Sequence, residues 1–206
     1  MKAMLSAPDK TLIAAMPPFP LLPLAAISLV QTPAQIEAAM AALKAAACVG
    51  FDTESKPTFH KGQTSDGPHL VQFATAYQAW LFQTRVAGVQ AAIAELLHDA
   101  ALAKIGFGLA NDTSQLAHKF GIHPQNLVDL DRNFRQLGYR NSVGAKGAIA
   151  ILFGQRFIKS KRISTSNWAL AQLSEQQMIY AANDAYAAIR VHEALRALPI
   201  PKASNE

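Results

Sequence analysis

Cysteine is almost missing from this 206-residue chain, and its scarcity removes two classes of site. Cys48 is the only cysteine. It has no second thiol with which to form an internal disulfide, and it cannot build a metal site of several thiolates. Because disulfides accumulate in oxidising compartments, a chain without them fits a reducing one. We therefore expect a cytoplasmic protein.

The sequence also lacks a long uninterrupted apolar run. Its most apolar stretch, Thr11 to Val30, is broken by prolines at positions 17, 18, 20 and 23. A signal peptide needs a continuous apolar segment, and a membrane-spanning helix needs about 20 predominantly apolar residues. We expect residues 1–25 to form a Pro-rich arm, residues 26–200 a single domain and residues 201–206 a short tail. We expect no contact with a membrane.

Acidic residues are few, which gives the chain a basic balance. There are 14 Asp and Glu against 19 Lys and Arg, so the formal net charge is +5. A positive surface favours a polyanionic partner such as nucleic acid, although net charge alone does not define a ligand. Half of the residues are hydrophobic, which is enough for one compact domain with a buried core.

The order of hydrophobic patterns predicts a mixed sheet. Strands are expected at 27–32, 48–54, 69–75, 79–84, 103–107 and 127–130. Helices are expected from Pro33, at 86–98, after residue 107 up to Gly121, at 145–153 and at 174–198, with polar loops at 55–68 and 160–168. Ser174 and Gln177 form a capping box at the start of the last helix. A meander followed by alternating strands and helices indicates an α/β domain.

The segment "VGFDTESKPTF" ends a predicted strand in two acids. Because side chains alternate faces along a strand, Asp52 and Glu54 point the same way. Two neighbouring carboxylates repel, and each raises the pKa of the other. An apolar strand has little structural reason to end in this way. We expect something positive between the two.

Two further acids and a tyrosine lie on predicted helices. Asp112 is at the start of a helix in "GFGLANDTSQL", and Asp184 lies in "YAANDAY" with Tyr180 four residues before it on the same helix face. Each alone also has a structural explanation. Asp112 favours a helix N-terminus, Asp184 fits a solvent-facing position, and Tyr180 fits a core. If the four acids converge, they suit two hard cations such as Mg²⁺ or Mn²⁺.

Three segments, "FDTES", "GFGLANDTSQL" and "YAANDAY", resemble the three motifs of the DEDD superfamily of 3′-5′ exonucleases, in its tyrosine subgroup. The stretch "SNWALAQLSEQQMIYAANDAY" is similar to the corresponding part of ribonuclease D and of the Werner syndrome protein exonuclease domain. The resemblance covers residues 27–198, with the motifs in the family's order. It implies a ribonuclease H-like fold, a mixed sheet flanked by helices, and hydrolysis of phosphodiester bonds from the 3′ end of DNA or RNA with two divalent cations.

The resemblance also implies roles for individual residues. Asp52, Glu54, Asp112 and Asp184 would be the metal-binding acids, with Asp52 bridging both ions, and Tyr180 would position the attacking water. One departure is clear. Relatives often carry an Arg-Pro pair where this chain has alanine and glutamine, at positions 171 and 172, so a substrate contact by that arginine is not carried over.

Basic residues indicate where a substrate would bind. Eight of them, and no acid, lie between positions 132 and 174: Arg132, Arg135, Arg140, Lys146, Arg156, Lys159, Lys161 and Arg162. They form either a phosphate-contacting surface or a solvated basic subdomain. The candidate substrate-binding residues are Lys56, His60, Lys159, Lys161 and Arg162. The expected partner is a nucleic acid with a single-stranded 3′ end.

Two other functions remain open at this point. One is a non-catalytic nucleic-acid-binding module of the same fold, and the other is a phosphodiesterase of small oligonucleotides. An intact set of four acids and a tyrosine favours the exonuclease, because a binding module has no need of it. Discrimination between DNA and RNA depends on contacts to the 2′-hydroxyl, and no segment of the sequence indicates them.

Overall fold

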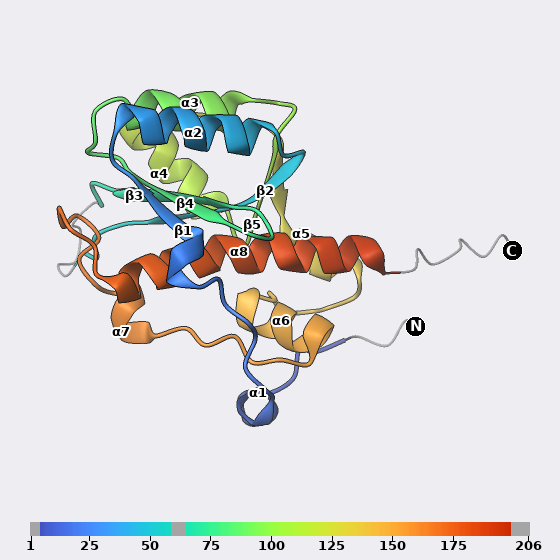
Figure 1. Cartoon of the computed structure of the whole chain (residues 1–206). Helices are drawn as coiled ribbons and strands as arrows, with labels where there is room; N and C mark the ends of the chain where they lie inside the picture. The colour runs from blue at the N-terminus through green and yellow to red at the C-terminus, as the bar shows by residue number, and fades with distance from the viewer. Residues whose placement is uncertain (1–4, 59–64, 199–206) are drawn as a thin grey trace, which may run out of the picture.

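The computed structural model describes residues 5–58 and 65–198 (Figure 1). Six strands form one sheet in the order β1-β4-β3-β2-β5-β6. Their bounds are Ile27–Val30 for β1, Cys48–Glu54 for β2, Leu70–Ala74 for β3, Ala79–Gln83 for β4, Ala103–Gly106 for β5 and Leu127–Asp129 for β6. Strands β2, β3 and β4 are antiparallel, whereas β1, β5 and β6 each pair in parallel with a neighbour. The predicted mixed sheet is confirmed.

Helices cover both faces of the sheet (Figure 1). The helices α2 (Pro33–Lys44), α3 (Val89–His98) and α4 (Ala110–Phe120) pack on one face, and α5 (Leu130–Gln136), α6 (Ala145–Phe153) and α8 (Glu175–Ala197) pack on the other. Within the described residues, no helix combines the length and the apolar content needed to cross a membrane. The capping box at the start of α8 is present as expected.

The two faces of the sheet hold two separate apolar cores. The core under α2, α3 and α4 contains large buried side chains, among them Phe51, Phe73 and Leu96. The core under α8 contains a row of buried alanines, at positions 181, 182, 185, 187 and 188. Small side chains let a helix backbone lie close to the sheet, so α8 is positioned by a different kind of packing from α2 and α3.

Gly50 in β2 marks the closest approach of α8 to the sheet. A Cβ atom added there would lie 1.8 Å from the carbonyl oxygen of Ala185. No side chain fits in that space. Gly50 lies two residues before Asp52, and Ala185 directly follows Asp184. The contact therefore fixes the position of the helix beside the acidic end of the strand.

Three helices lie where the sequence pattern did not predict them. Helix α5 follows β6 directly, α7 (Lys161–Ser164) lies in the segment expected to be a loop, and α1 (Lys10–Ala15) lies in the N-terminal arm. These helices have 7, 4 and 6 residues, which is too short for a clear apolar period. Each begins at a side-chain cap, provided by Asp129, Ser160 and Asp9 respectively.

The described part of the N-terminal arm packs against the domain. Phe19 and Leu22 are buried in the core under α8. The backbone N–H of Leu22 donates a hydrogen bond to Oδ1 of Asn183 at 2.8 Å. The backbone N–H of Phe19 donates to the carbonyl of Arg156 at 2.9 Å. The arm thus ends on the helix that carries Asp184.

Candidate active site

Three of the four predicted acids converge at the carboxyl end of β2. One carboxylate oxygen from each of Asp52, Glu54 and Asp184 lies within 4.8 Å of the others. Asp52 and Glu54 share a face of β2, as the strand alternation predicts. Asp184 reaches them from α8, because Gly50 allows that helix to approach the strand closely. Two elements more than 120 positions apart in the chain therefore build one acidic cluster.

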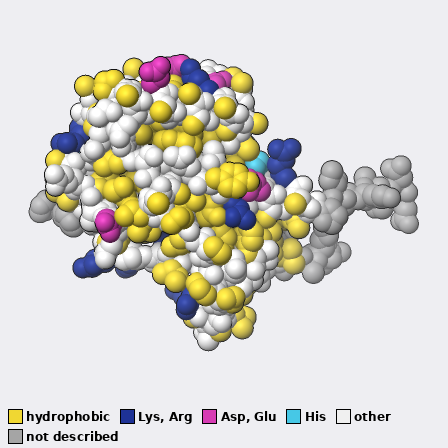
Figure 2. Space-filling view, viewed as in Figure 1, with side chains coloured by type: hydrophobic (Ala, Val, Ile, Leu, Met, Phe, Trp, Pro, Cys, Tyr) yellow, Lys and Arg dark blue, Asp and Glu magenta, His cyan; other side chains and the backbone are white. Residues whose placement is uncertain are grey.

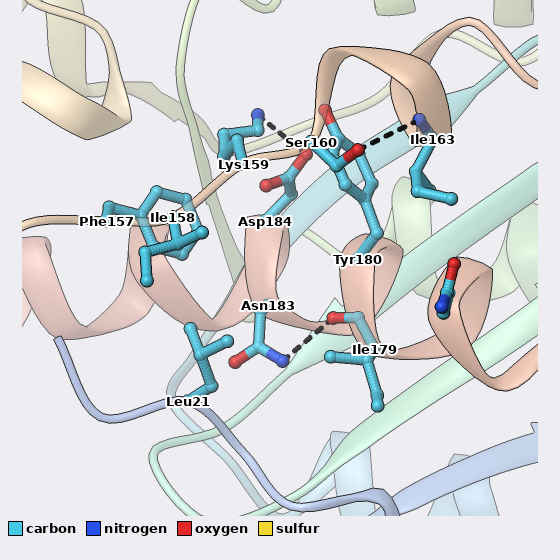
Figure 3. Close-up of a pocket in the computed structure, with 11 residues that line it drawn as sticks. Leu21, Phe157, Ile158, Lys159, Ser160, Ile163, Ile179, Tyr180, Asn183 and Asp184 are labelled. Atoms are coloured by element: carbon cyan, nitrogen blue, oxygen red, sulfur yellow. Dashed lines mark hydrogen bonds and ion pairs between the residues drawn. The ribbon is translucent and has the colours of Figure 1, made fainter. Parts of the chain in front are cut away.

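Asp184 is a buried residue, with 5% of its surface exposed. Its Oδ2 atom forms an ion pair with Nζ of Lys159 at 2.7 Å, as Figure 3 shows. Its Oδ1 atom is buried and has no hydrogen-bond partner among the described residues. A solvent-facing role for Asp184, which the sequence alone allowed, is therefore wrong. A buried carboxylate oxygen without a partner, on a residue that converges with two other acids, is suited to be a cation ligand.

Asp112 lies beside this cluster and is held by Thr53. It is buried in the first turn of α4, and the hydroxyl of Thr53 donates a hydrogen bond to its Oδ1 atom. Asp112 is outside the group of three acids whose oxygens lie within mutual reach. Its charge nevertheless acts on Asp52 and raises the pKa of that carboxyl. Thr53, which lies between Asp52 and Glu54 in β2, thus connects Asp112 to the acidic cluster.

The electrostatics of the cluster favour a positive ligand. Burial, followed by the charges of Asp184 and Asp112, raises the pKa of Asp52 well above its ordinary value. Burial and the charge of Asp52 raise the pKa of Glu54 to about 10. Both pKa values are raised because the buried carboxylates have too little positive charge beside them. Three converging carboxylates are the donor set that Mg²⁺ and Mn²⁺ prefer, so the residues fit such an ion.

Lys159 places a positive charge at the acidic cluster. Burial is the largest single effect and opposes that charge, but Asp184, Tyr180 and Asp52 together outweigh it and raise the pKa of Lys159. Its Nζ atom also lies over the ring of Tyr180, 5.2 Å from the ring centroid, a cation–π geometry. The sequence predicted Lys159 as a substrate-binding residue, and the structure places its ammonium group on the cluster itself.

Tyr180 lies one helical turn before Asp184 and faces the same side (Figure 3). Burial and the charge of Asp184 raise the pKa of its hydroxyl to about 12. The hydroxyl is therefore protonated at neutral pH and can donate a hydrogen bond. The ring also packs on Trp168, with the centroids 6.0 Å apart. Tyr180 thus has both a fixed ring and a usable hydroxyl.

The remaining predicted substrate residues have different surroundings. Lys161 and Arg162 are exposed on α7, and Lys161 lines a pocket together with Lys159 and Tyr180. Lys56 is exposed just after β2, and its backbone N–H donates to Nδ1 of His69 at 3.1 Å. His60 lies outside the described residues.

Of the other basic residues in the segment from 132 to 174, two have internal partners. Arg135 forms an ion pair with Asp131 at 2.6 Å. Arg156 donates to the carbonyl of Ala14 at 2.9 Å. The basic segment is therefore partly structural, and only some of its charges face the site.

Sequence reasoning missed Thr53 and also Gln72. In the β2–β3 ladder Gln72 is paired directly with Asp52, and cross-strand partners share a face. Gln72 is fully buried, and neither polar atom of its amide has a hydrogen-bond partner among the described residues. A single polar residue inside the apolar run "LVQFA" was the available signal. Its position makes it a neighbour of the acidic cluster.

Comparisons with known proteins agree in their matches to 3′-5′ exonucleases. Residues 27–198 match the sequence model of a family described as 3′-5′ exonuclease. A "3′-5′ exonuclease" of Arabidopsis thaliana is 30% identical over 155 residues, which are 74% of this chain and 54% of that protein. The "Bifunctional 3′-5′ exonuclease/ATP-dependent helicase WRN" of Mus musculus is 28% identical over 149 residues, or 71% of this chain and 11% of that protein. The chain thus spans about half of the first relative and a small part of the second.

A solved structure shows the same fold. Ribonuclease D of Trypanosoma brucei, in a complex with RNA U12, has a TM-score of 0.73 and 18% identity, over 91% of this chain and 65% of that one. The likeness confirms the expected ribonuclease H-like architecture. The sequence resemblance to ribonuclease D and to the Werner syndrome protein is confirmed as well.

Proposed function

The chain belongs to the 3′-5′ exonuclease family, and we propose that it hydrolyses phosphodiester bonds from the 3′ end of a nucleic acid strand. The observation that carries this proposal is the convergence of Asp52 and Glu54 from β2 with Asp184 from α8. The intact tyrosine at position 180 on the same helix face supports it. Family membership alone would also fit a protein that binds without cleaving, whereas an acidic cluster this unfavourable has no evident use in such a protein.

Divalent cations, Mg²⁺ or Mn²⁺, would supply Lewis-acid stabilisation of the phosphate and a water of lowered pKa. Asp52, Glu54 and Asp184 would hold them, together with Asp112 beside the cluster. Thr53 fixes the orientation of Asp112 through its hydroxyl. The burial of this site keeps the carboxylates close together and strengthens their hold on a cation.

Tyr180 and Lys159 act on the substrate side of the cluster. The protonated hydroxyl of Tyr180 donates a hydrogen bond and orients the attacking water. Lys159 brings a positive charge within 2.7 Å of Asp184, so it offsets the negative charge of an incoming phosphate. Lys161 and Arg162 on α7, together with Lys56 after β2, would contact phosphates farther from the reacting bond.

The substrate proposed is a single-stranded 3′ end of DNA or RNA. The test is digestion of 5′-labelled single-stranded DNA and RNA with Mg²⁺, with Mn²⁺ and with EDTA. The variant is Asp52→Ala, and Glu37→Ala is a matched control because Glu37 is exposed on α2. Wild type and Glu37→Ala are expected to shorten the strand stepwise from the 3′ end, and only with metal.

Three results would contradict this proposal. Binding without cleavage under all conditions would identify a nucleic-acid-binding module. Hydrolysis of a dinucleotide without attack on a longer strand would identify a phosphodiesterase of small oligonucleotides. A ladder that persists in Asp52→Ala would show that the acidic cluster does not carry the reaction.

A further inference from the structure

A second hollow lies next to the acidic cluster and is formed in part by the N-terminal arm. Its lining residues are Lys10, Ile13, Ala14, Lys146, Arg156, Phe157, Ile158 and Lys159, and we refer to it as the arm groove. Its volume is about 620 Å³. Lys10, Ile13 and Ala14 come from α1, which lies outside the residues 27–198 that match the family. The groove is thus built by this chain's own extension together with the domain.

The arm groove adjoins the candidate active site. Phe157, Ile158 and Lys159 line both the groove and the pocket of about 340 Å³ that contains Tyr180 and Asp184 (Figure 3). Lys146 and Lys159 also line a third hollow with Tyr180. The positive charge of Lys146 reaches Asp184 and lowers its pKa, against the larger opposite effect of burial. A chain leaving the acidic cluster past Lys159 would enter the groove directly.

Hydrogen bonds fix the arm on the domain, so the groove has a defined wall. Arg156 uses both its backbone and its side chain for this. Its N–H donates to the carbonyl of Pro17 at 2.7 Å, and its Nη1 atom donates to the carbonyl of Ala14 at 2.9 Å. Its buried Nε atom has no hydrogen-bond partner among the described residues. The arm is further held at Leu22 by Asn183.

The lining has the chemistry of a site for a single strand. Four of its eight residues are Lys or Arg, and none of the eight is acidic. Lys10 and Lys146 are exposed, and within the described residues neither forms an ion pair. Ile158 is 59% exposed. In Figure 2 the lower part of the molecule, where Figure 1 places α1 and α7, shows Lys and Arg among hydrophobic side chains.

Single-stranded nucleic acids bind where cations track the phosphates and apolar surfaces receive the bases. We propose that the arm groove holds the stretch of the substrate strand immediately 5′ of the reacting phosphate, with Lys10 and Lys146 on its phosphates. This inference rests on the proposed function, because it assigns the path of that substrate. It gives the N-terminal arm a role in binding that the family domain alone does not have.

The test measures the affinity of the whole chain for a short 5′-labelled single strand by fluorescence anisotropy, in EDTA and at several salt concentrations. The variants are Lys10→Gln and Lys10→Gln/Lys146→Gln. Each phosphate contact to a single strand contributes about 0.7 to the slope of log Kd against log salt. We expect the slope to fall by about 0.7 in the single variant and about 1.4 in the double variant.

Lys44→Gln is the control for net charge, because Lys44 is an exposed helical lysine on α2, where it pairs with Glu95 on the other face of the sheet. Its slope should equal that of wild type. With metal present, the groove variants should lose more kcat/KM on a long strand than on a dinucleotide, which is too short to reach Lys10.

Two results would contradict the proposal that the arm groove binds the substrate strand. One is an unchanged slope in the double variant. The other is an equal loss in Lys44→Gln, which would show an effect of net charge alone. Neither would affect the proposed exonuclease, provided that wild type still shortens the strand from its 3′ end. If wild type fails to do so, it is the proposed function that fails.

Discussion

The two faces of the sheet are packed in opposite ways. Under α2 and α3, large side chains such as Phe73 and Leu96 fill the space between helix and sheet. Under α8, alanines and Gly50 bring the helix backbone nearly into contact with β2. Both faces bury apolar area, which is the main source of stability. The second places charged side chains of two elements side by side.

This difference explains why Asp52, Glu54 and Asp184 converge on the α8 face. Burying carboxylates together is unfavourable without a cation, as the raised pKa values of Asp52 and Glu54 show. A helix held at a distance by large side chains could not bring Asp184 to β2. The close approach is therefore part of the site, and the apolar cores on both faces of the sheet provide the stability that the site lacks.

Removing one acid should give the largest effect. We expect Asp52→Asn to lower kcat by about 1,000-fold, equivalent to about 4 kcal/mol in the barrier, because it removes a proposed metal ligand. The same change removes like-charge repulsion, so it should raise the melting temperature of the metal-free protein. Calorimetry and a digestion assay measure the two effects. Retention of near wild-type kcat would contradict the role of Asp52.

A pair of core substitutions compares the two faces directly. Gly50→Ala adds a methyl group where Ala185 leaves no space. It should destabilise the protein by about 1–3 kcal/mol and also reduce kcat, because α8 must move. Leu96→Ala should reduce the free energy of unfolding by about 2–5 kcal/mol and leave kcat in the folded protein unchanged. Urea unfolding and kinetics below the unfolding transition test both, and equal effects on kcat would remove the distinction between the faces.

Metal should stabilise the protein by binding at the acidic cluster beside α8. A cation at 100 times its Kd adds about 2.7 kcal/mol to the free energy of unfolding. Because the folded pKa of Glu54 is raised to about 10, the folded metal-free protein binds more protons than the unfolded chain, whose Glu titrates at about 4.3. Stability without metal should then fall as pH rises between those values.

Thermal unfolding with EDTA and with Mn²⁺ across this pH range measures both effects. Addition of the cation should weaken the fall with pH, since it replaces the protons on the carboxylates. A metal-free stability that rises with pH throughout would contradict the assignment. Asp52→Asn serves as the control and should show a smaller gain from Mn²⁺.

The tyrosine should give the smallest of these effects. Tyr180→Phe keeps the ring that packs on Trp168 but removes the hydroxyl. We expect kcat to fall by about tenfold, because one hydrogen bond contributes about 1 kcal/mol and 1.36 kcal/mol is about a factor of ten in rate, while metal affinity stays nearly unchanged. Isothermal titration with Mn²⁺ separates the two quantities. A loss of metal affinity in Tyr180→Phe would show that the hydroxyl supports the ion rather than the water.

Much of this architecture follows from local sequence patterns. The bounds of β2 and of α6 agree with prediction, because acids follow the apolar run of β2 and glycines at positions 144 and 154 flank α6. The acids at positions 52, 54, 112 and 184 could be proposed from their places on β2, α4 and α8. Their burial and mutual distances could not, because these depend on how closely α8 approaches β2.

Other features carried too weak a signal. The short helices α1 and α7 have no apolar period to detect. The ion pair of Lys159 with Asp184 joins residues 25 positions apart across a loop, and nothing local predicts it. The contact of the N-terminal arm with Asn183 spans 161 positions. Long-range contacts of this kind arise from tertiary packing.

The central claim is that the acids of β2 and α8 together form a divalent cation site. The most direct measurement is the anomalous diffraction of Mn²⁺ in crystals of the wild-type chain. The account predicts a strong peak within coordination distance of Asp52, Glu54 and Asp184. A peak elsewhere, or no peak there at saturating Mn²⁺, would contradict it.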